Sequence, residues 1–153
     1  MIEGRPAPAP LASALLVDTG VWTWVRDRRF PHLAEWFNSQ VAGGRILVCD
    51  LVALELVRLA PNADRATEVA ARLDLFGRVP MVSAAWTRAR QLQLALARQG
   101  THRRVPPADL LIAATALEAS VPVLHYDRDY ERIAAVSELR HRWLVAPGTL
   151  DPT

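Results

Sequence analysis

The chain has 153 residues, 51% hydrophobic and 22% charged, with a formal net charge of +2, as is typical of one globular domain. Its single cysteine excludes a disulfide framework, and its lack of lysine (all 18 basic residues are arginine) excludes phosphate-loop NTPases and Schiff-base enzymes. No apolar run approaches the roughly 18 residues of a membrane span and no signal peptide is evident, so we expect a cytoplasmic protein without membrane contact.

The two ends of the chain look unlike the rest. Residues 2–5 spell Ile-Glu-Gly-Arg, which resembles a fusion-protease recognition sequence, and a run rich in proline and alanine follows. We therefore predict a scar of a fusion protein or a flexible leader over residues 1–13, one folded domain over residues 14–146, and a C-terminal tail over residues 147–153.

Between these ends, short apolar runs alternate with longer helical patterns. This alternation predicts an α/β fold around a mostly parallel sheet. Because ligands of such sheets bind beyond the carboxyl ends of the strands, residues that directly follow strands are the first candidates for a site. The predicted strands are 14–17, 46–49, 79–82, 121–125 and 139–145. A helical stretch with Trp22, Trp24 and Val25 is predicted after the first strand, and the further predicted helices are 33–41, 51–59, 64–75, 83–99, 107–119 and 127–136.

Four carboxylates stand out by their positions in this pattern. Asp18 directly follows the first predicted strand, and Asp127 follows the fourth. Glu55 is the one acid of an apolar helix, and Asp109 lies in the first turn of another. Taken singly, each has an ordinary structural explanation: Asp18 and Asp127 as helix caps, Asp109 as a favourable charge at a helix start. Glu55 could pair with Arg58 one turn along its helix.

Taken together, the four carboxylates indicate a metal site. If they gather at one end of the sheet, their mutual repulsion has to be relieved by a proton or a cation. Oxygen ligands without a cysteine or histidine cluster favour Mg²⁺ or Mn²⁺ over zinc. Such an ion lowers the pKa of a bound water and stabilises charge on a phosphate, so the set favours phosphodiester hydrolysis by metal-activated water.

Four short motifs carry a family resemblance. They are Leu-Leu-Val-Asp-Thr at 15–19, Leu-Glu-Leu at 54–56, Asp-Leu-Leu-Ile-Ala-Ala-Thr-Ala at 109–116 and Val-Leu-His-Tyr-Asp-Arg-Asp-Tyr at 123–130. In this order, over about residues 15–145, the chain resembles the PIN-domain family, in particular the VapC toxin nucleases of VapBC toxin–antitoxin pairs.

The resemblance implies a fold, an activity and partners. The fold would be a PIN-like three-layer α/β/α sandwich, a single nuclease domain over residues 14–146. The activity would be an Mg²⁺-dependent (or Mn²⁺-dependent) endoribonuclease that cuts transfer or ribosomal RNA and, as the toxin of a type II pair, inhibits translation. The partners would be RNA, a cognate VapB-type antitoxin and a second copy of the chain in a homodimer.

The resemblance also implies the site residues. Thr19 and His125 would support the site. The sequence departs from the family pattern at Gly20, where a serine is frequent, and at His125, where a threonine or serine is usual. His125 could contact phosphate or simply end its strand. The catalytic and metal-binding residues would be carboxylates: Asp18, Glu55, Asp109 and Asp127, with Asp129 as a further metal ligand.

Basic and aromatic residues supply candidate contacts with partners. Arg98, His102, Arg103 and Arg104 lie in and before the loop that leads to the 107–119 helix, where they would contact RNA phosphates. The alternative is a solvated turn. Trp22, Trp24 and Trp36 could stack on bases or lie in the core, and Trp22 or Trp24 could line an apolar groove for an antitoxin helix.

Other function classes fit the sequence less well. The main alternative is a catalytically silent PIN-like module that binds RNA or a protein. A haloacid-dehalogenase-like phosphatase needs an aspartate where this chain has Gly20, and a response-regulator receiver needs a lysine. A flap-endonuclease-like enzyme normally needs a longer chain.

Overall fold

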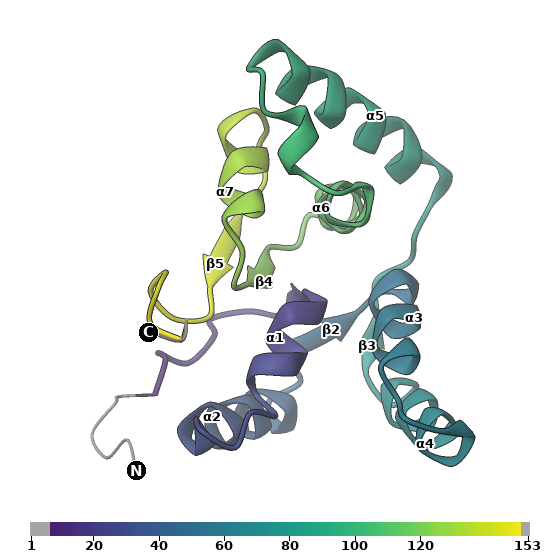
Figure 1. Ribbon diagram of the computed structural model, residues 1–153, viewed down its shortest axis with the longest axis vertical. Helices are drawn as coiled ribbons and strands as arrows, with labels where there is room; N and C mark the ends of the chain where they lie inside the picture. The colour runs from purple at the N-terminus through teal and green to yellow at the C-terminus, as the bar shows by residue number, and fades with distance from the viewer. Residues whose placement is uncertain (1–6, 151–153) are drawn as a thin grey trace.

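The core of the fold is one sheet of parallel strands in the order β3-β2-β1-β4-β5. Figure 1 shows the computed structural model, which describes residues 7–150. The expectations for residues 1–6 and 151–153 lie outside these described residues. The strands are β1 (Leu15–Val17), β2 (Ile46–Val48), β3 (Gly77–Arg78), β4 (Val123–His125) and β5 (His141–Trp143).

Helices cover both faces of the sheet, which confirms the predicted three-layer α/β/α sandwich around a parallel sheet. Since crossovers between parallel strands are right-handed, the path β1-β2-β3 and the return path to β4 and β5 put their helices on opposite faces. Figure 1 shows α2 on one side of the sheet and α5 and α6 on the other. The helices are α1 (Thr19–Trp24), α2 (Pro31–Ala42), α3 (Asp50–Arg58), α4 (Ala63–Leu73), α5 (Ser83–Arg98), the 3₁₀ turn η1 (His102–Arg104), α6 (Pro107–Ala119) and α7 (Arg128–Ala135).

The most apolar helix, α6, is buried at the centre of its layer. Its residues Ile112, Ala113 and Ala114 are fully buried, because α5 and α7 pack on it. Pro107 opens the helix at its first turn, where a missing N–H costs nothing. Among residues 7–150 no helix is both long and apolar enough to span a bilayer.

The third strand differs from its prediction. Residues 79–82 were expected to form it, and the strand instead occupies Gly77–Arg78, where Leu47 and Val48 pair with it. Val79 still donates its N–H to the Val48 carbonyl at 2.8 Å, but Pro80 follows, and proline has no N–H to continue the ladder. A side chain at Gly77 would meet the Leu47 side chain at 2.8 Å.

Parts of both expected end segments pack against the domain. Leu11 is 2% exposed and donates its N–H to the Gln40 side chain at 2.9 Å. Trp36 donates to the Ala9 carbonyl at 3.2 Å. At the other end, Leu150 is 1% exposed and donates its N–H to the Tyr126 hydroxyl at 3.0 Å. The buried core therefore includes Leu11 and Leu150.

Candidate metal centre

The site begins where β1 ends, beside β4. The sheet order reverses between these two strands, and such a switch point leaves a crevice at the carboxyl ends of the strands. Asp18 directly follows β1 and donates its N–H to the Leu124 carbonyl of β4 at 2.9 Å. The carboxylate of Asp18 therefore stands at the mouth of this crevice.

Both oxygens of the Asp18 carboxylate are held by the protein. Asp18 is the N-cap of α1, and its Oδ2 accepts the N–H of Gly20 at 3.2 Å. Its Oδ1 accepts the hydroxyl hydrogen of Tyr130 at 2.7 Å. Tyr130 is fully buried and Asp18 is 7% exposed. The expected capping role of Asp18 is thus real, and the buried tyrosine gives the carboxylate a second restraint that a cap does not need.

Asp127 and Asp129 lie at the start of α7. Asp127 is the N-cap of this helix, and its Oδ1 accepts the N–H of Asp129 at 2.9 Å. Asp129 is 8% exposed and forms an ion pair with Arg132 at 2.6 Å. One carboxylate oxygen of Asp127 lies within 4.8 Å of one of Asp129, and the charge of Asp129 contributes to the raised pKa of Asp127. Two carboxyls this close require either a shared proton or a cation between them.

Asp109, in the first turn of α6, closes the cluster. One carboxylate oxygen from each of Asp109, Asp127 and Asp129 lies within 4.8 Å of the others. Oxygens this close suit a single hard cation such as Mg²⁺ or Mn²⁺, which takes carboxylate ligands. The residues present therefore fit the cation that the sequence predicts.

Burial and mutual repulsion raise the pKa values of these carboxyls. The pKa of Asp109 is raised to about 8, mainly by burial and then by the charges of Asp18 and Asp127. Burial also raises the pKa of Asp127. The pKa of Asp18 is raised by burial, although the hydrogen bonds from Tyr130 and Gly20 act in the opposite direction. Near neutral pH the cluster has to hold a proton or a cation.

Glu55 lies beside this cluster on α3. Its Oε1 accepts the hydroxyl hydrogen of Thr19 at 3.0 Å, and its charge contributes to the raised pKa of Asp18. The expected alternative, an ion pair of Glu55 with Arg58, is not among the ion pairs of residues 7–150. Glu55 is therefore tied to the α1 end of the site through Thr19, outside the three-carboxylate group.

His125 is a buried residue that orients its neighbour. It has no solvent exposure, so it cannot contact a substrate phosphate. Its Nδ1 accepts the N–H of Asp127 at 3.2 Å, so its proton lies on Nε2, 2.8 Å from Nδ1 of His141. Burial and the nearby His141 lower the pKa of His125 to about 3. The ring is therefore neutral, and it holds the backbone that presents Asp127.

The basic residues between α5 and α6 face solvent. Arg98, His102, Arg103 and Arg104 are all exposed, and none forms an ion pair within the described part of the chain. Arg103 and Arg104 belong to η1, which leads directly into the first turn of α6 that carries Asp109. Their positive charges are thus free for an anionic partner near the carboxylates.

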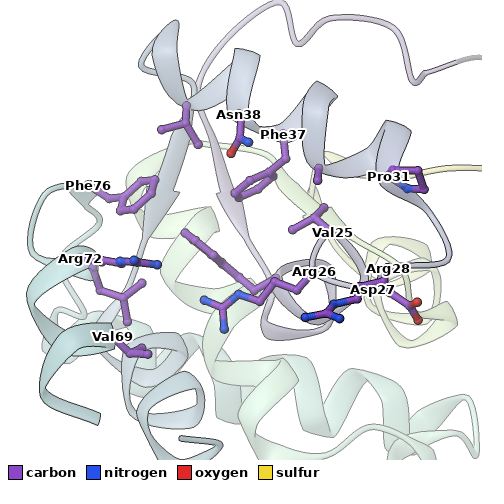
Figure 2. A pocket seen from close by; sticks show the side chains of 14 residues that line it. Val25, Arg26, Asp27, Arg28, Pro31, Phe37, Asn38, Val69, Arg72 and Phe76 are labelled. Carbon is purple, nitrogen blue, oxygen red and sulfur yellow. The ribbon is translucent and has the colours of Figure 1, made fainter. Parts of the chain in front are cut away.

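Sequence reasoning missed two features of this region. The first is the hydrogen bond from Tyr130 to Asp18. In the sequence, Tyr130 is only the aromatic residue of the fourth motif, and the one signal for this role is its position directly after Asp129. The second feature is a cavity of about 610 Å³ between α1, α2 and α4, shown in Figure 2. Trp22, one of the residues expected to face a partner, lines this cavity. Trp24 instead packs edge-on against Tyr126 and Phe30.

Comparison with known proteins yields one family and several relatives. The family model described as PIN domain matches residues 15–136. The chain is 36% identical over 136 residues to Ribonuclease VapC18 of Mycobacterium tuberculosis (strain ATCC 25618 / H37Rv), covering 88% of this chain and 97% of that protein. It is 40% identical over 120 residues to Ribonuclease VapC21 of Mycobacterium tuberculosis (strain CDC 1551 / Oshkosh), covering 78% and 87% respectively.

Solved structures share the fold at lower identity. DNA-bound VapBC from Salmonella typhimurium superposes with a TM-score of 0.68 at 21% identity, covering 87% of this chain and 99% of that chain. VapBC2 from Rickettsia felis, bound to a promoter DNA fragment, gives a TM-score of 0.64 at 14% identity, covering 85% and 98%.

Proposed function

The chain belongs to the PIN-domain family, and from that premise we propose that it is a divalent-metal-dependent endoribonuclease, the toxin of a VapBC-type toxin–antitoxin pair. Its relatives at 36% and 40% identity are named ribonucleases. The observation that carries the proposal is the convergence of Asp109, Asp127 and Asp129 oxygens within 4.8 Å, with Asp18 at the adjoining strand end.

In this proposal the carboxylates bind the cation and the substrate phosphate lies beside it. Asp18, Asp109 and Asp127 are the principal ligands, with Asp129 as a further one and Glu55 acting from the α3 side. A bound Mg²⁺ or Mn²⁺ supplies an activated water and stabilises charge that develops on the phosphate. Every carboxylate that the family pattern requires is present, which favours an active enzyme over a silent binding module.

Neighbouring side chains hold these carboxylates in place. Tyr130 fixes one oxygen of Asp18, Thr19 restrains Glu55, and the neutral His125 fixes the Asp127 backbone. Such restraints increase the rate of catalysis, because a carboxylate that is already held in place does not have to reorganise during the reaction. Thr19 and His125 therefore act as positioning residues in this account.

The exposed basic loop is the proposed RNA contact. Arg98, His102, Arg103 and Arg104 would bind backbone phosphates, since guanidinium groups match phosphate oxygens in a bidentate geometry. Contacts of this kind place RNA over the carboxylates without reading its sequence. Cleavage of transfer or ribosomal RNA would stop translation, and this is the proposed effect of the toxin.

The cavity between α1, α2 and α4 is the proposed seat of the antitoxin. The solved structures that share the fold include structures of VapBC, which supports a VapB-type partner. The cavity is largely apolar, and its lining includes Val25 and Arg26 at the C-terminal end of α1, the helix whose other end follows Asp18 of the proposed metal site. A partner segment placed there would be tethered close to the carboxylates.

A second copy of the chain is the other proposed partner. Three large apolar side chains stand exposed on α3 and α5: Leu54 at 70%, Trp86 at 59% and Leu94 at 60%. Exposed apolar side chains of this size favour burial against another surface. We assign them to a homodimer interface, which light scattering of the purified protein would test.

The proposed activity is tested by RNA cleavage. Total RNA from the source organism is incubated with the protein and Mg²⁺ or Mn²⁺, with EDTA in a parallel reaction, and the new ends are mapped by sequencing. Asp18→Asn is the test variant, and Asp64→Asn, an exposed aspartate of α4, is the matched control. Cuts at defined sites that need metal and Asp18 support the proposal. A folded protein that binds RNA and cuts nothing under either metal would be a silent module.

A further inference from the structure

The cavity between α1, α2 and α4 combines an apolar wall with guanidinium groups. Its wall includes Val25, Phe37, Val69 and Phe76 from all three helices and their flanking loops. Figure 2 shows the Arg26 and Arg72 side chains extending into the space between these apolar residues. Arg28 also lines the cavity, which brings the number of lining arginines to three. An apolar hollow that also presents positive charge selects for an occupant with both properties.

The positive charge in the cavity is only partly neutralised. Arg72 forms an ion pair with Glu68 at 2.9 Å, and the same carboxylate also binds Arg65 at 2.6 Å. Arg26 forms no ion pair or hydrogen bond through its side chain within residues 7–150. Asp27, the acid that lines the cavity, is engaged by Arg29 at 2.7 Å. Partial burial and the charges of Arg72 and Arg65 lower the pKa of Arg26.

Covering this cavity would create an electrostatic cost. In the free protein, water solvates the exposed Arg26 side chain. A wholly apolar segment that filled the cavity would displace this water and leave a desolvated charge without a partner, which is strongly unfavourable. A carboxylate on the incoming segment removes that cost, because two guanidinium groups can bind its oxygens in charge-assisted hydrogen bonds.

We therefore propose, on the basis of the proposed toxin function, that the cavity binds an amphipathic segment of the antitoxin whose apolar side chains fill the hollow and whose single Asp or Glu reaches between Arg26 and Arg72. The apolar side chains supply affinity by burial. The acid supplies specificity, because a segment with a neutral or basic residue at that position leaves the arginines unpaired.

The wall of the cavity favours a peptide over RNA as the occupant. Trp22 packs edge-on against Phe37 and Phe76, each at 5.1 Å between ring centroids. These rings are thus engaged with one another, and Trp22 and Phe37 are 4% and 6% exposed. Base stacking needs an open aromatic face, whereas aliphatic side chains need only a hollow. An RNA bound through its phosphates to the arginines would also leave the apolar wall of the cavity exposed to water.

A selection with a displayed peptide library tests the proposal. The library holds 16-residue peptides with Leu, Ile or Phe at helical spacing (i, i+3, i+4, i+7) and all residues allowed elsewhere. It is selected against the wild-type protein, against Arg26→Gln/Arg72→Gln, and against Arg140→Gln, an exposed arginine that lines a different hollow. We expect Asp or Glu to be enriched at one position with wild type and Arg140→Gln, and not with the double variant.

Titration of one selected peptide makes the result quantitative. The peptide and its Glu→Gln counterpart are compared by fluorescence anisotropy, and the acidic form should bind wild type about tenfold more tightly. This ratio should fall to about one with Arg26→Gln/Arg72→Gln and be partly kept with Arg26→Lys, which retains the charge but not the fork geometry. Circular dichroism establishes that each variant is folded.

Three outcomes would overturn the proposal. They are the absence of any wild-type binder, equal binding of the Glu and Gln peptides, and displacement of the peptide by a single-stranded RNA oligonucleotide that needs Arg26 and Arg72. The RNA cleavage assay on the wild-type protein is separate. A cleaving enzyme without acid preference contradicts this inference alone, and acid preference without cleavage contradicts the proposed activity alone.

Discussion

The two ends of α1 lie beside charged groups of opposite sign, carboxylates at the N-terminus and arginines at the C-terminus. At its N-terminus, Asp18 joins a cluster of carboxylates whose pKa values are raised by burial and mutual repulsion. At its C-terminal side, Arg26 and Arg72 line an apolar cavity, and the one ion pair that either arginine forms within residues 7–150 is that of Arg72 with Glu68. The carboxylates at the N-terminal end favour a bound cation, and the arginines at the C-terminal end favour a bound anion. The helix α1 between them has six residues.

The ends differ in how firmly the protein holds its charged groups. Asp18 and Asp129 are at most 8% exposed, and hydrogen bonds from Tyr130 and from backbone N–H groups fix the cluster. The arginines are carried by long side chains that reach solvent. We infer that the acidic end is organised before its ligand binds, as catalysis requires, whereas the arginine end becomes organised when its partner binds.

The largest expected effect is on catalysis at the acidic end. Asp109→Asn removes the charge of one proposed metal ligand and should lower RNA cleavage by at least about 100-fold, since groups that stabilise charge at the reacting centre have effects of this size. The rate of cleavage of a mapped RNA site by the purified variant measures it. Asp64→Asn should cleave like wild type, and an active Asp109→Asn protein would remove this residue from the site.

The same cluster should make stability depend on pH and metal. A carboxyl whose pKa is raised in the folded state stabilises the protein at low pH and loses this contribution as pH rises from about 4 to about 8. Asp109→Asn should therefore be more stable than the metal-free wild type by about 2 kcal/mol at pH 7. Urea unfolding of both proteins across this range measures the difference.

Two controls isolate this effect. His125, with a pKa of about 3, lowers stability as pH falls below its unfolded value, and it does so equally in both proteins, so their difference reports Asp109. Saturating Mg²⁺ or Mn²⁺ should raise the wild-type unfolding temperature by about 5–10 °C and that of the variant far less. Equal metal shifts in both proteins would count against the cluster.

The buried tyrosine tests how far the acidic end depends on its restraints. Tyr130→Phe removes the hydroxyl that donates to Asp18 at 2.7 Å, which should lower the free energy of unfolding by about 1–3 kcal/mol. Cleavage should fall by about tenfold because Asp18 is less well placed. Chemical denaturation and cleavage kinetics measure both. Tyr126→Phe is the half-buried control, and an unchanged cleavage rate in Tyr130→Phe would show that Asp18 needs no such restraint.

The basic loop should give a smaller effect, confined to RNA binding. Arg103→Gln and Arg104→Gln each remove an exposed charge, so the slope of log affinity against log salt should decrease by about 0.7 for each phosphate of a single strand that the protein no longer neutralises. Fluorescence anisotropy with a labelled RNA in EDTA measures binding without cleavage. Identical salt slopes in wild type and both variants would assign the loop to a solvated turn.

The smallest expected effect is the stability change at the arginine end. Arg26→Gln breaks no ion pair or side-chain hydrogen bond of residues 7–150, so the free energy of unfolding should stay within about 0.5 kcal/mol of wild type. Thermal unfolding of the two proteins measures it. A decrease of several kcal/mol would mean that Arg26 is an internal structural residue, and the contrast between the two ends of α1 would disappear.

The sheet and the carboxylates were predictable because their signals are local. Strands such as β1 and β4 are short apolar runs that end at an acid, and the parallel fold brings such strand ends together. The position of β3 was not predictable from apolar residues alone, because Gly77 and Arg78 form the strand and Pro80 ends it. The assignment of the clustered carboxylates as metal ligands stays a prediction.

The features that sequence reasoning missed depend on long-range packing. Tyr130 donates to a residue 112 positions away, and nothing near Tyr130 in the chain distinguishes this role from ordinary core packing. The cavity forms only because α1, α2 and α4 pack together, which brings Arg26 next to Arg72. The family resemblance alone predicted that the chain has a protein partner. The chemical character of that partner could be inferred only from the cavity that the packed helices form.

The most direct measurement of the central claim is the position of bound metal. Crystals of the protein grown or soaked with Mn²⁺ would be measured at a wavelength where manganese scatters anomalously. We expect one anomalous peak or two adjacent ones between the carboxylates of Asp18, Asp109 and Asp127, and none there in Asp109→Asn crystals. An empty cluster in a protein that still cleaves RNA with Mn²⁺, or a peak at another site, would contradict it.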